Sequence, residues 1–136
     1  MNKQKVLVTG ANGFIGSNLV IRLSEVSHIE ILHFVRGDTI DMLTTLVESA
    51  DAVVHLAGEN RPNDVADFAR NNVDLTSALC DAIQNTGRNI PLIFVSSMQA
   101  THDNPYGQSK LAAEQVIESF VSKTDNSAVI YRLVGV

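Results

Sequence analysis

Apolar positions along the chain fall alternately in short runs and at helical spacing. Runs rich in β-branched residues predict five strands, at 6–8, 30–36, 51–58, 91–97 and 128–134. Apolar residues three and four positions apart predict helices from residue 15, over 41–50, over 65–84 and over 106–121. Because the strands alternate with helices, we expect an α/β fold: a Rossmann-type three-layer sandwich with a parallel sheet of about five strands.

Three glycines at spacing G-x-x-G-x-x-G follow the first strand: Gly10, Gly13 and Gly16. Gly10 permits a tight turn, Gly13 lets backbone approach a pyrophosphate, and Gly16 lets the next helix pack closely on the strand. The N-terminus of that helix supplies N–H groups and a positive dipole end to an anion. A flexible turn is the alternative interpretation, but the position between a strand and an amphipathic helix favours dinucleotide binding.

Arg36 stands at the end of the second predicted strand, where a dinucleotide fold meets the adenosine ribose. An acidic residue there selects NAD, whereas an arginine accommodates a 2′-phosphate, so Arg36 favours NADP(H). An ordinary exposed arginine at a strand end is the alternative. Because few residues separate Arg36 from the helix at 41–50, a strand and a helix of the usual two-half pattern are expected to be shortened there and the sheet to be smaller than average.

Arg61 and Asn72 can each be interpreted in two ways, as functional or as structural residues. The loop 59–64 is polar and follows a strand's carboxyl end, so Arg61 either holds a phosphate or belongs to a solvated turn. Asn72 lies on the apolar face of the helix predicted at 65–84. A buried amide needs partners, so Asn72 either ties neighbouring backbone or positions catalytic residues.

The fourth strand ends at Ser97, and the helix that follows begins with Tyr106 and carries Lys110 one turn later. Residues four apart share one helix face, so the phenol and the ammonium point the same way. A nearby ammonium is expected to lower the pKa of a phenol. With Ser97 on the same substrate oxygen, the three residues predict a proton donor aimed at a carbonyl, beside a nicotinamide that delivers hydride.

Composition narrows the classes of protein. At 136 residues the chain is expected to form one domain, and 45% hydrophobic against 18% charged residues fits a globular core. A formal net charge of −5 disfavours nucleic acid or an anionic membrane as the main partner. No leader and no membrane-spanning apolar run is evident, so a cytoplasmic protein is expected.

Cysteine and histidine usage predicts no metal site and no disulfide. Cys80 is the single cysteine and lies within an apolar-periodic helix, so we expect a small buried side chain. The histidines show no close metal-ligand spacing: His28, His33, His55 and His102.

The chain resembles the extended short-chain dehydrogenase/reductases, which include sugar-nucleotide epimerases, dehydratases and reductases. The residues that carry the resemblance are Thr9–Gly16, His55–Gly58, Asn72–Val73, Ser96–Ser97 and the pair Tyr106 and Lys110. The longer stretches 55–62 and 96–110 resemble the capsular and O-antigen enzymes that make UDP-2-acetamido-2,6-dideoxy-L-talose.

That resemblance implies NADPH-dependent reduction of a 4-keto UDP-sugar. Tyr106 would be the general acid, Lys110 its activator and a ribose ligand, and Ser97 the hydroxyl that orients the carbonyl. The implied cofactor residues are Gly10, Asn12, Gly13, Phe14, Ile15, Gly16, Arg36, Leu56, Ala57, Gly58, Arg61, Asn72 and Lys110.

The resemblance also sets expectations for the whole protein. We expect residues 1–136 to be a fragment comprising the NADP(H)-binding domain, without the family's remaining substrate-binding region and its zinc-containing cupin domain. Members of the superfamily often dimerise, here through helices 65–84 and 106–121. A UDP-sugar is the implied substrate.

Two other functions stay open at this point. A sugar-nucleotide 4-epimerase would use the same tyrosine and lysine; a 4,6-dehydratase is disfavoured because Met98-Gln99 stands where those enzymes place an Asp-Glu pair. A non-catalytic dinucleotide-binding sensor is the alternative from another class, because a fold does not determine a function.

Overall fold

The computed structural model describes residues 3–57 and 69–134 of the chain. In order, its elements are β1 (Gln4–Thr9), α1 (Phe14–Ser24), β2 (Ile29–Phe34), α2 (Ile40–Ser49), β3 (Ala52–His55), the π-helix η1 (Ala69–Asp74), α4 (Leu75–Thr86), β4 (Leu92–Ser97), the short 3-10 helix η2 (Met98–Thr101), α5 (Pro105–Lys123) and β5 (Ala128–Leu133).

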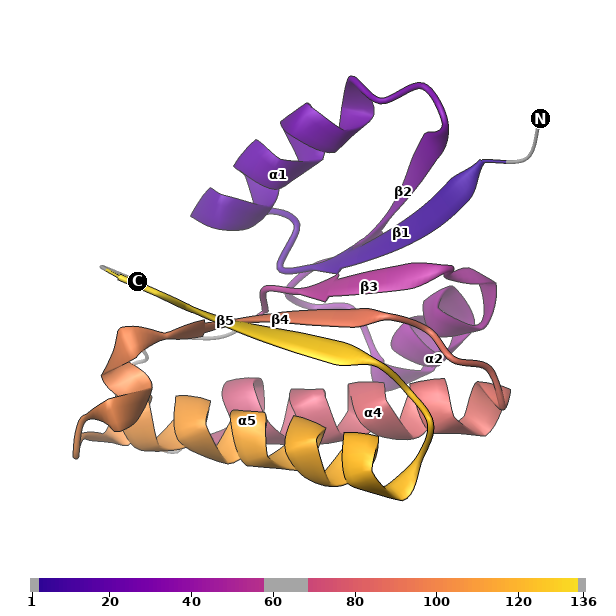
Figure 1. The fold of residues 1–136 in the computed structure, drawn as a ribbon. Helices are drawn as coiled ribbons and strands as arrows, with labels where there is room; N and C mark the ends of the chain where they lie inside the picture. The colour runs from indigo at the N-terminus through magenta and orange to yellow at the C-terminus, as the bar shows by residue number, and fades with distance from the viewer. Residues whose placement is uncertain (1–2, 58–68, 135–136) are drawn as a thin grey trace.

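The strands form one five-stranded sheet in the order β2-β1-β3-β4-β5, and every neighbouring pair is parallel. Figure 1 shows α1 on one face of the sheet and α2, α4 and α5 on the other. This arrangement confirms the predicted three-layer α/β fold. The strand order reverses direction between β1 and β3, the point where open parallel sheets bind ligands at their carboxyl edge.

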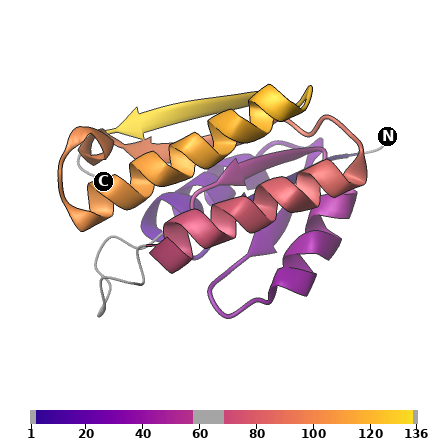
Figure 2. The same cartoon turned by 90° about the horizontal axis from the view of Figure 1, so that it is seen from below.

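The core lies between the sheet and the layer of α2, α4 and α5. Seen from below in Figure 2, α4 and α5 run side by side along the sheet, with α2 next to α4. Leu7, Val53 and Phe94 from the strands pack there against Leu79 and Ile117 from the helices, and all five are at most 1% exposed. Within the described residues, none of the helices is long and apolar enough to span a lipid bilayer.

Cys80 on α4 is buried, as predicted, with 3% of its surface exposed. Burial, reinforced by the nearby charge of Asp81, raises the pKa of its thiol to about 12. A thiol with that pKa is protonated at neutral pH, so Cys80 is a small apolar core residue.

The strand predicted at 128–134 is present as β5. Within the described residues β5 pairs with β4, and Val129 and Tyr131 are 48% and 53% exposed. Successive side chains of a strand point to opposite faces, and Val129 and Tyr131 alternate with the half-buried Ala128 and Ile130. In the part of the chain that the structure describes, the strand is therefore less buried than its apolar composition indicates.

Two boundaries also differ from prediction. The helix expected over 65–84 is described from residue 69, where a turn of π-helix precedes α4, and 65–68 lie outside the described residues. The helix also ends two residues later than expected, at Thr86, where Gly87 adopts φ 70°, the left-handed conformation typical of helix ends. Between β4 and α5 the chain forms the single turn η2.

Candidate functional site

The glycine-rich turn after β1 leaves no room for side chains at two of its three glycines. Gly10 has φ 69°, and a Cβ there would lie 2.9 Å from the backbone nitrogen of Ala57. A Cβ on Gly16 would overlap the carbonyl oxygen of Gly10. Gly13 is the N-cap of α1, and no described side chain caps that helix. The turn thus brings bare backbone and a helix N-terminus together, which is the arrangement that binds phosphate.

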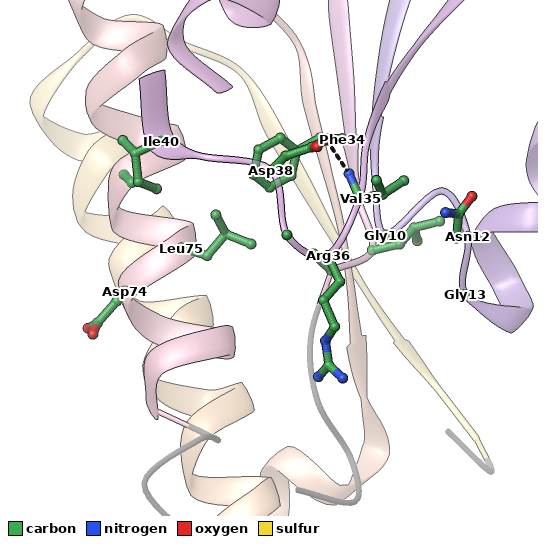
Figure 3. A pocket seen from close by; sticks show the side chains of 14 residues that line it. Gly10, Asn12, Gly13, Phe34, Val35, Arg36, Asp38, Ile40, Asp74 and Leu75 are labelled. Carbon is green, nitrogen blue, oxygen red and sulfur yellow. Dashed lines mark hydrogen bonds between the residues drawn. The ribbon is translucent and has the colours of Figure 1, made fainter. Parts of the chain in front are cut away.

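A cavity of about 790 Å³ opens beside this turn, at the carboxyl ends of β1, β2 and β3. Six of the predicted cofactor residues line it: Gly10, Asn12, Gly13, Arg36, Leu56 and Ala57. In Figure 3 the glycine turn stands on one side, Ile40, Asp74 and Leu75 stand on the other, and Arg36 lies between them. The volume is within the usual range for pockets that hold small molecules and cofactors.

A tight turn after β2 presents Arg36 to the cavity. The backbone nitrogen of Asp38 donates to the carbonyl of Val35 at 3.0 Å, and the Asp38 carboxylate accepts from the nitrogen of Val35 at 2.9 Å. Gly37 takes φ 98°, which other residues rarely adopt. Because the Asp38 carboxylate is engaged in the turn, the exposed Arg36 guanidinium is the long charged group that this segment offers to the cavity.

Other predicted cofactor residues lie elsewhere. Phe14 is 86% exposed, and neither it, Ile15 nor Gly16 lines the cavity, although all three begin α1 directly beyond it. Gly58 and Arg61 lie outside the described residues.

Sequence reasoning missed the far wall of the cavity. That wall comes from the start of α2 and of α4, and includes Ile40, Asp74, Leu75 and Ala78. The apolar periodicity of both helices was visible, but only the topology shows that their first turns face the glycine loop.

Ser97, Tyr106 and Lys110 come together at the carboxyl end of β4, as predicted. Their exposed fractions are only 1%, 7% and 5%. Ser97 is the N-cap of η2: its hydroxyl accepts a hydrogen bond from the nitrogen of Gln99 at 3.1 Å. Ser97 is also hydrogen-bonded to Tyr106. A Cβ on Gly107 would overlap the carbonyl oxygen of Gln99, so η2 packs directly on the first turn of α5. This contact holds the serine and the tyrosine close together.

Lys110 is buried among aromatic rings. Its Nζ lies 5.3 Å from the ring centroid of Phe94 and 5.8 Å from that of Tyr106. Burial lowers the pKa of Lys110 to about 8, and the charge of Glu114 opposes that shift. Near neutral pH the amine is therefore mostly protonated, and the ammonium makes cation–π contacts with both rings.

The sequence argument that Lys110 lowers the pKa of the Tyr106 phenol is wrong for this structure. Burial raises that pKa, and the hydrogen bond with Ser97 opposes the shift only in part. The ammonium lies over the phenol ring, and burial outweighs any attraction between the two groups. A raised pKa keeps the proton on the phenol, which is the form that a proton donor needs.

A buried histidine connects the cavity to this cluster. Thr9 Oγ1 accepts from the backbone nitrogens of Leu56 and Ala57, both at 3.0 Å, and contacts His55 Nδ1 at 2.6 Å. With both lone pairs used, the threonine hydroxyl donates to Nδ1, so Nε2 carries the proton toward Thr76 Oγ1 at 2.8 Å. Burial, and then the charge of Lys110, lowers the pKa of His55 to about 3, so the ring is neutral.

The chain of hydrogen bonds continues to α5. Thr76 donates to the carbonyl of Asn72 at 2.6 Å, and the Asn72 amide donates to Ser109 Oγ at 2.7 Å. Ser109 in turn donates to the carbonyl of Tyr106 at 2.7 Å. Asn72, only 1% exposed, therefore links η1 to the helix that carries the tyrosine, whereas it does not line the cavity.

Comparison with known proteins places this geometry in a family. Residues 6–136 match the NAD dependent epimerase/dehydratase family, and the chain belongs to it. The resemblance to extended short-chain dehydrogenase/reductases is thereby confirmed. The family is described as NAD dependent, which agrees with a dinucleotide as the class of ligand for the cavity.

Particular relatives are similar over nearly the whole chain. The UDP-2-acetamido-2,6-beta-L-arabino-hexul-4-ose reductase of Pseudomonas aeruginosa is 46% identical over 132 residues, covering 97% of this chain and 36% of that protein. The capsular polysaccharide assembling protein CapF from Staphylococcus aureus superposes with a TM-score of 0.80 at 32% identity, covering 95% of this chain and 34% of that one. The chain thus spans about a third of the length of these two relatives.

A second solved structure with a similar fold contains a sugar nucleotide and a dinucleotide. MoeE5 in complex with UDP-glucose and NAD has a TM-score of 0.76 at 25% identity and covers 93% of this chain and 52% of that one.

Proposed function

We propose that the chain is the NADP(H)-binding, catalytic part of a reductase that acts on the 4-keto group of a UDP-2-acetamido-2,6-dideoxy-hexos-4-ulose. The observation that carries the proposal is that Ser97, Tyr106 and Lys110 lie at the same sheet edge as the cavity beside the glycine turn. The 46% identity to a UDP-sugar 4-keto reductase supports the substrate class.

The described residues fit a dinucleotide. The bare backbone of Gly10 and Gly13 and the uncapped start of α1 suit a pyrophosphate. Arg36 at the cavity wall suits a 2′-phosphate, which favours NADP(H) over NAD(H). When bound, the reduced nicotinamide supplies a hydride.

The chain's own residues supply the proton. As hydride reaches C4 of the sugar, the phenol of Tyr106 donates its proton to the carbonyl oxygen, so the ketone becomes an alcohol. Ser97 holds that oxygen, and the Lys110 ammonium stabilises the phenolate that forms. The raised pKa of Tyr106 keeps the proton in place until the transfer.

The test compares the chain's two tyrosines. Tyr106→Phe should lower NADPH oxidation with the 4-keto UDP-sugar by about 10² to 10⁴-fold, the usual contribution of a general acid, while NADPH affinity changes little. Tyr131→Phe, on the exposed edge strand, should retain activity. Full activity in Tyr106→Phe would refute the mechanism.

A 4-epimerase would use the same tyrosine and lysine, and we favour the reductase because the relative at 46% identity has that activity. A 4-hydroxy UDP-sugar, incubated with the enzyme and NADP⁺ in place of the 4-keto substrate and NADPH, should therefore not be converted to its C4 epimer. The dimer expected through α4 and α5 and the cytoplasmic location stay predictions.

A further inference from the structure

Glu114 is a buried carboxylate that the proposed reaction does not use. It lies on α5 one turn after Lys110 and two turns after Tyr106, and it is 3% exposed. Three hydrogen bonds hold it: Ser96 Oγ donates at 2.7 Å, and Arg132 donates from Nε at 2.9 Å and from Nη2 at 2.7 Å. A side chain so restrained has a fixed position relative to Lys110.

These hydrogen bonds keep the carboxylate ionised. Burial alone would raise the pKa of Glu114, but the bonds from Arg132 and Ser96, with the charges of Arg132 and Lys110, lower it overall. The Arg132 side chain is 35% exposed, so solvent screens much of its charge. The negative charge of Glu114 is therefore only partly cancelled toward the interior, where Lys110 lies.

Few charged groups of the described residues lie near Lys110. On its own helix it faces Tyr106 and Glu114; from β3 it faces His55, which is neutral; and β4 presents the ring of Phe94. Arg132 on β5 reaches this region through Glu114. Among the described residues, Glu114 is the anion whose charge acts on the ammonium. Without it, a buried amine between aromatic rings would lose its proton more readily.

We propose that Glu114 is a positioning residue whose carboxylate, fixed by Ser96 and Arg132, is the counter-charge that keeps the buried Lys110 ammonium charged at neutral pH. The consequence for catalysis rests on the proposed function, because a charged Lys110 is what stabilises the Tyr106 phenolate. The effect of Glu114 on the charge of Lys110 does not depend on the proposed reaction, because it can be measured in the folded chain without substrate.

The test is a titration of Lys110 in the full chain with ¹³C-labelled lysine, read from the ε-carbon chemical shift, with Lys110→Met assigning the signal. Glu114→Gln should move the midpoint to lower pH by about one unit, a tenfold change in proton affinity. Arg132→Gln removes the salt bridge, but near pH 8, where Lys110 titrates, the Ser96 hydrogen bond and the Lys110 charge still favour the ionised Glu114 carboxylate. The Lys110 midpoint in this variant should therefore stay unchanged or rise, because a nearby cation is lost. A lower Lys110 midpoint in Glu114→Gln together with an unchanged or higher one in Arg132→Gln would show that the Glu114 charge, and not a general loss of packing around Lys110, causes the shift.

An unchanged Lys110 midpoint in Glu114→Gln would overturn the inference, and so would a fall in Arg132→Gln. If Glu114→Gln does not fold, the Arg132→Gln result still decides. The titration needs no substrate, so its failure is distinct from failure of the proposed reaction, which would appear as undiminished turnover by Tyr106→Phe.

Discussion

The dinucleotide cavity and the Ser97, Tyr106 and Lys110 cluster lie at the same edge of one sheet, yet they are built in different ways. The cavity has bare backbone on one wall, at Gly10 and Gly13, with the exposed Arg36 beside it and apolar side chains on the far wall. The cluster is formed by polar side chains that are almost completely buried. The glycine turn of the cavity depends on the absence of side chains, whereas the cluster depends on the environment of its side chains.

This difference determines what each region tolerates. In the glycine turn an added Cβ meets neighbouring backbone, so shape is the constraint. In the cluster burial shifts the pKa values of Tyr106, Lys110 and His55, so charge is the constraint. We therefore expect the first region to be sensitive to volume and the second to be sensitive to pH.

The largest effect is expected in the glycine turn. Gly16→Ala should lower the free energy of unfolding by roughly 3 kcal/mol and abolish NADPH binding, because the new Cβ overlaps the carbonyl of Gly10. Gly87→Ala is the matched control: its Cβ enters open space, so only the left-handed backbone is strained, at about 1 kcal/mol. Denaturant unfolding measures both, and equal losses would contradict the shape argument.

A second effect concerns pH and the buried histidine. The pKa of His55 falls from 6.5 to about 3 on folding, so the unfolded chain binds the extra proton and stability falls as pH drops through this window. Between pH 7 and pH 5 the loss should be about 2 kcal/mol, on the order expected for such a shift. Unfolding curves at the two pH values measure it.

The His55→Gln variant should have a lower free energy of unfolding than the unchanged protein at pH 7. Between pH 7 and pH 5, however, its free energy of unfolding should fall much less. His102→Gln, at an exposed position, is the control and should keep the slope of the unchanged protein. A slope that persists in His55→Gln would show that another group causes it.

The smallest effect is expected at the cavity wall. Arg36→Ser should reduce the preference for NADPH over NADH about tenfold, because one charge-assisted contact to a phosphate is lost. Arg22→Ser removes an equal charge from the exposed last turn of α1 and should leave the preference unchanged. Competitive titrations with the two cofactors give the ratio, and an unaltered ratio in Arg36→Ser would remove that residue from the specificity argument.

Local patterns predicted the elements and their order well. Glycine spacing, strand ends and the four-residue interval between Tyr106 and Lys110 are visible within a few positions of each other. The short interval after Arg36 also indicated a small sheet, and the described residues form five strands in which β2 lies next to β1.

Features that depend on distant parts of the chain were not predictable. His55 bonds to residues 46 and 21 positions away, and the apolar wall of the cavity comes from two separate helices. The shift of the Tyr106 pKa was wrongly predicted because the sequence shows the nearby lysine but not the burial. Glu114 had a visible signal, its four-residue spacing from Lys110, whereas its partner Arg132 lies 18 positions further on.

Titration of the 136-residue chain with NADPH and with NADH, followed by calorimetry, tests the central claim most directly. The account predicts that NADPH binds at least about tenfold more tightly than NADH, because Arg36 adds a phosphate contact to the shared pyrophosphate site. Equal or tighter binding of NADH, or binding of neither cofactor, would contradict it.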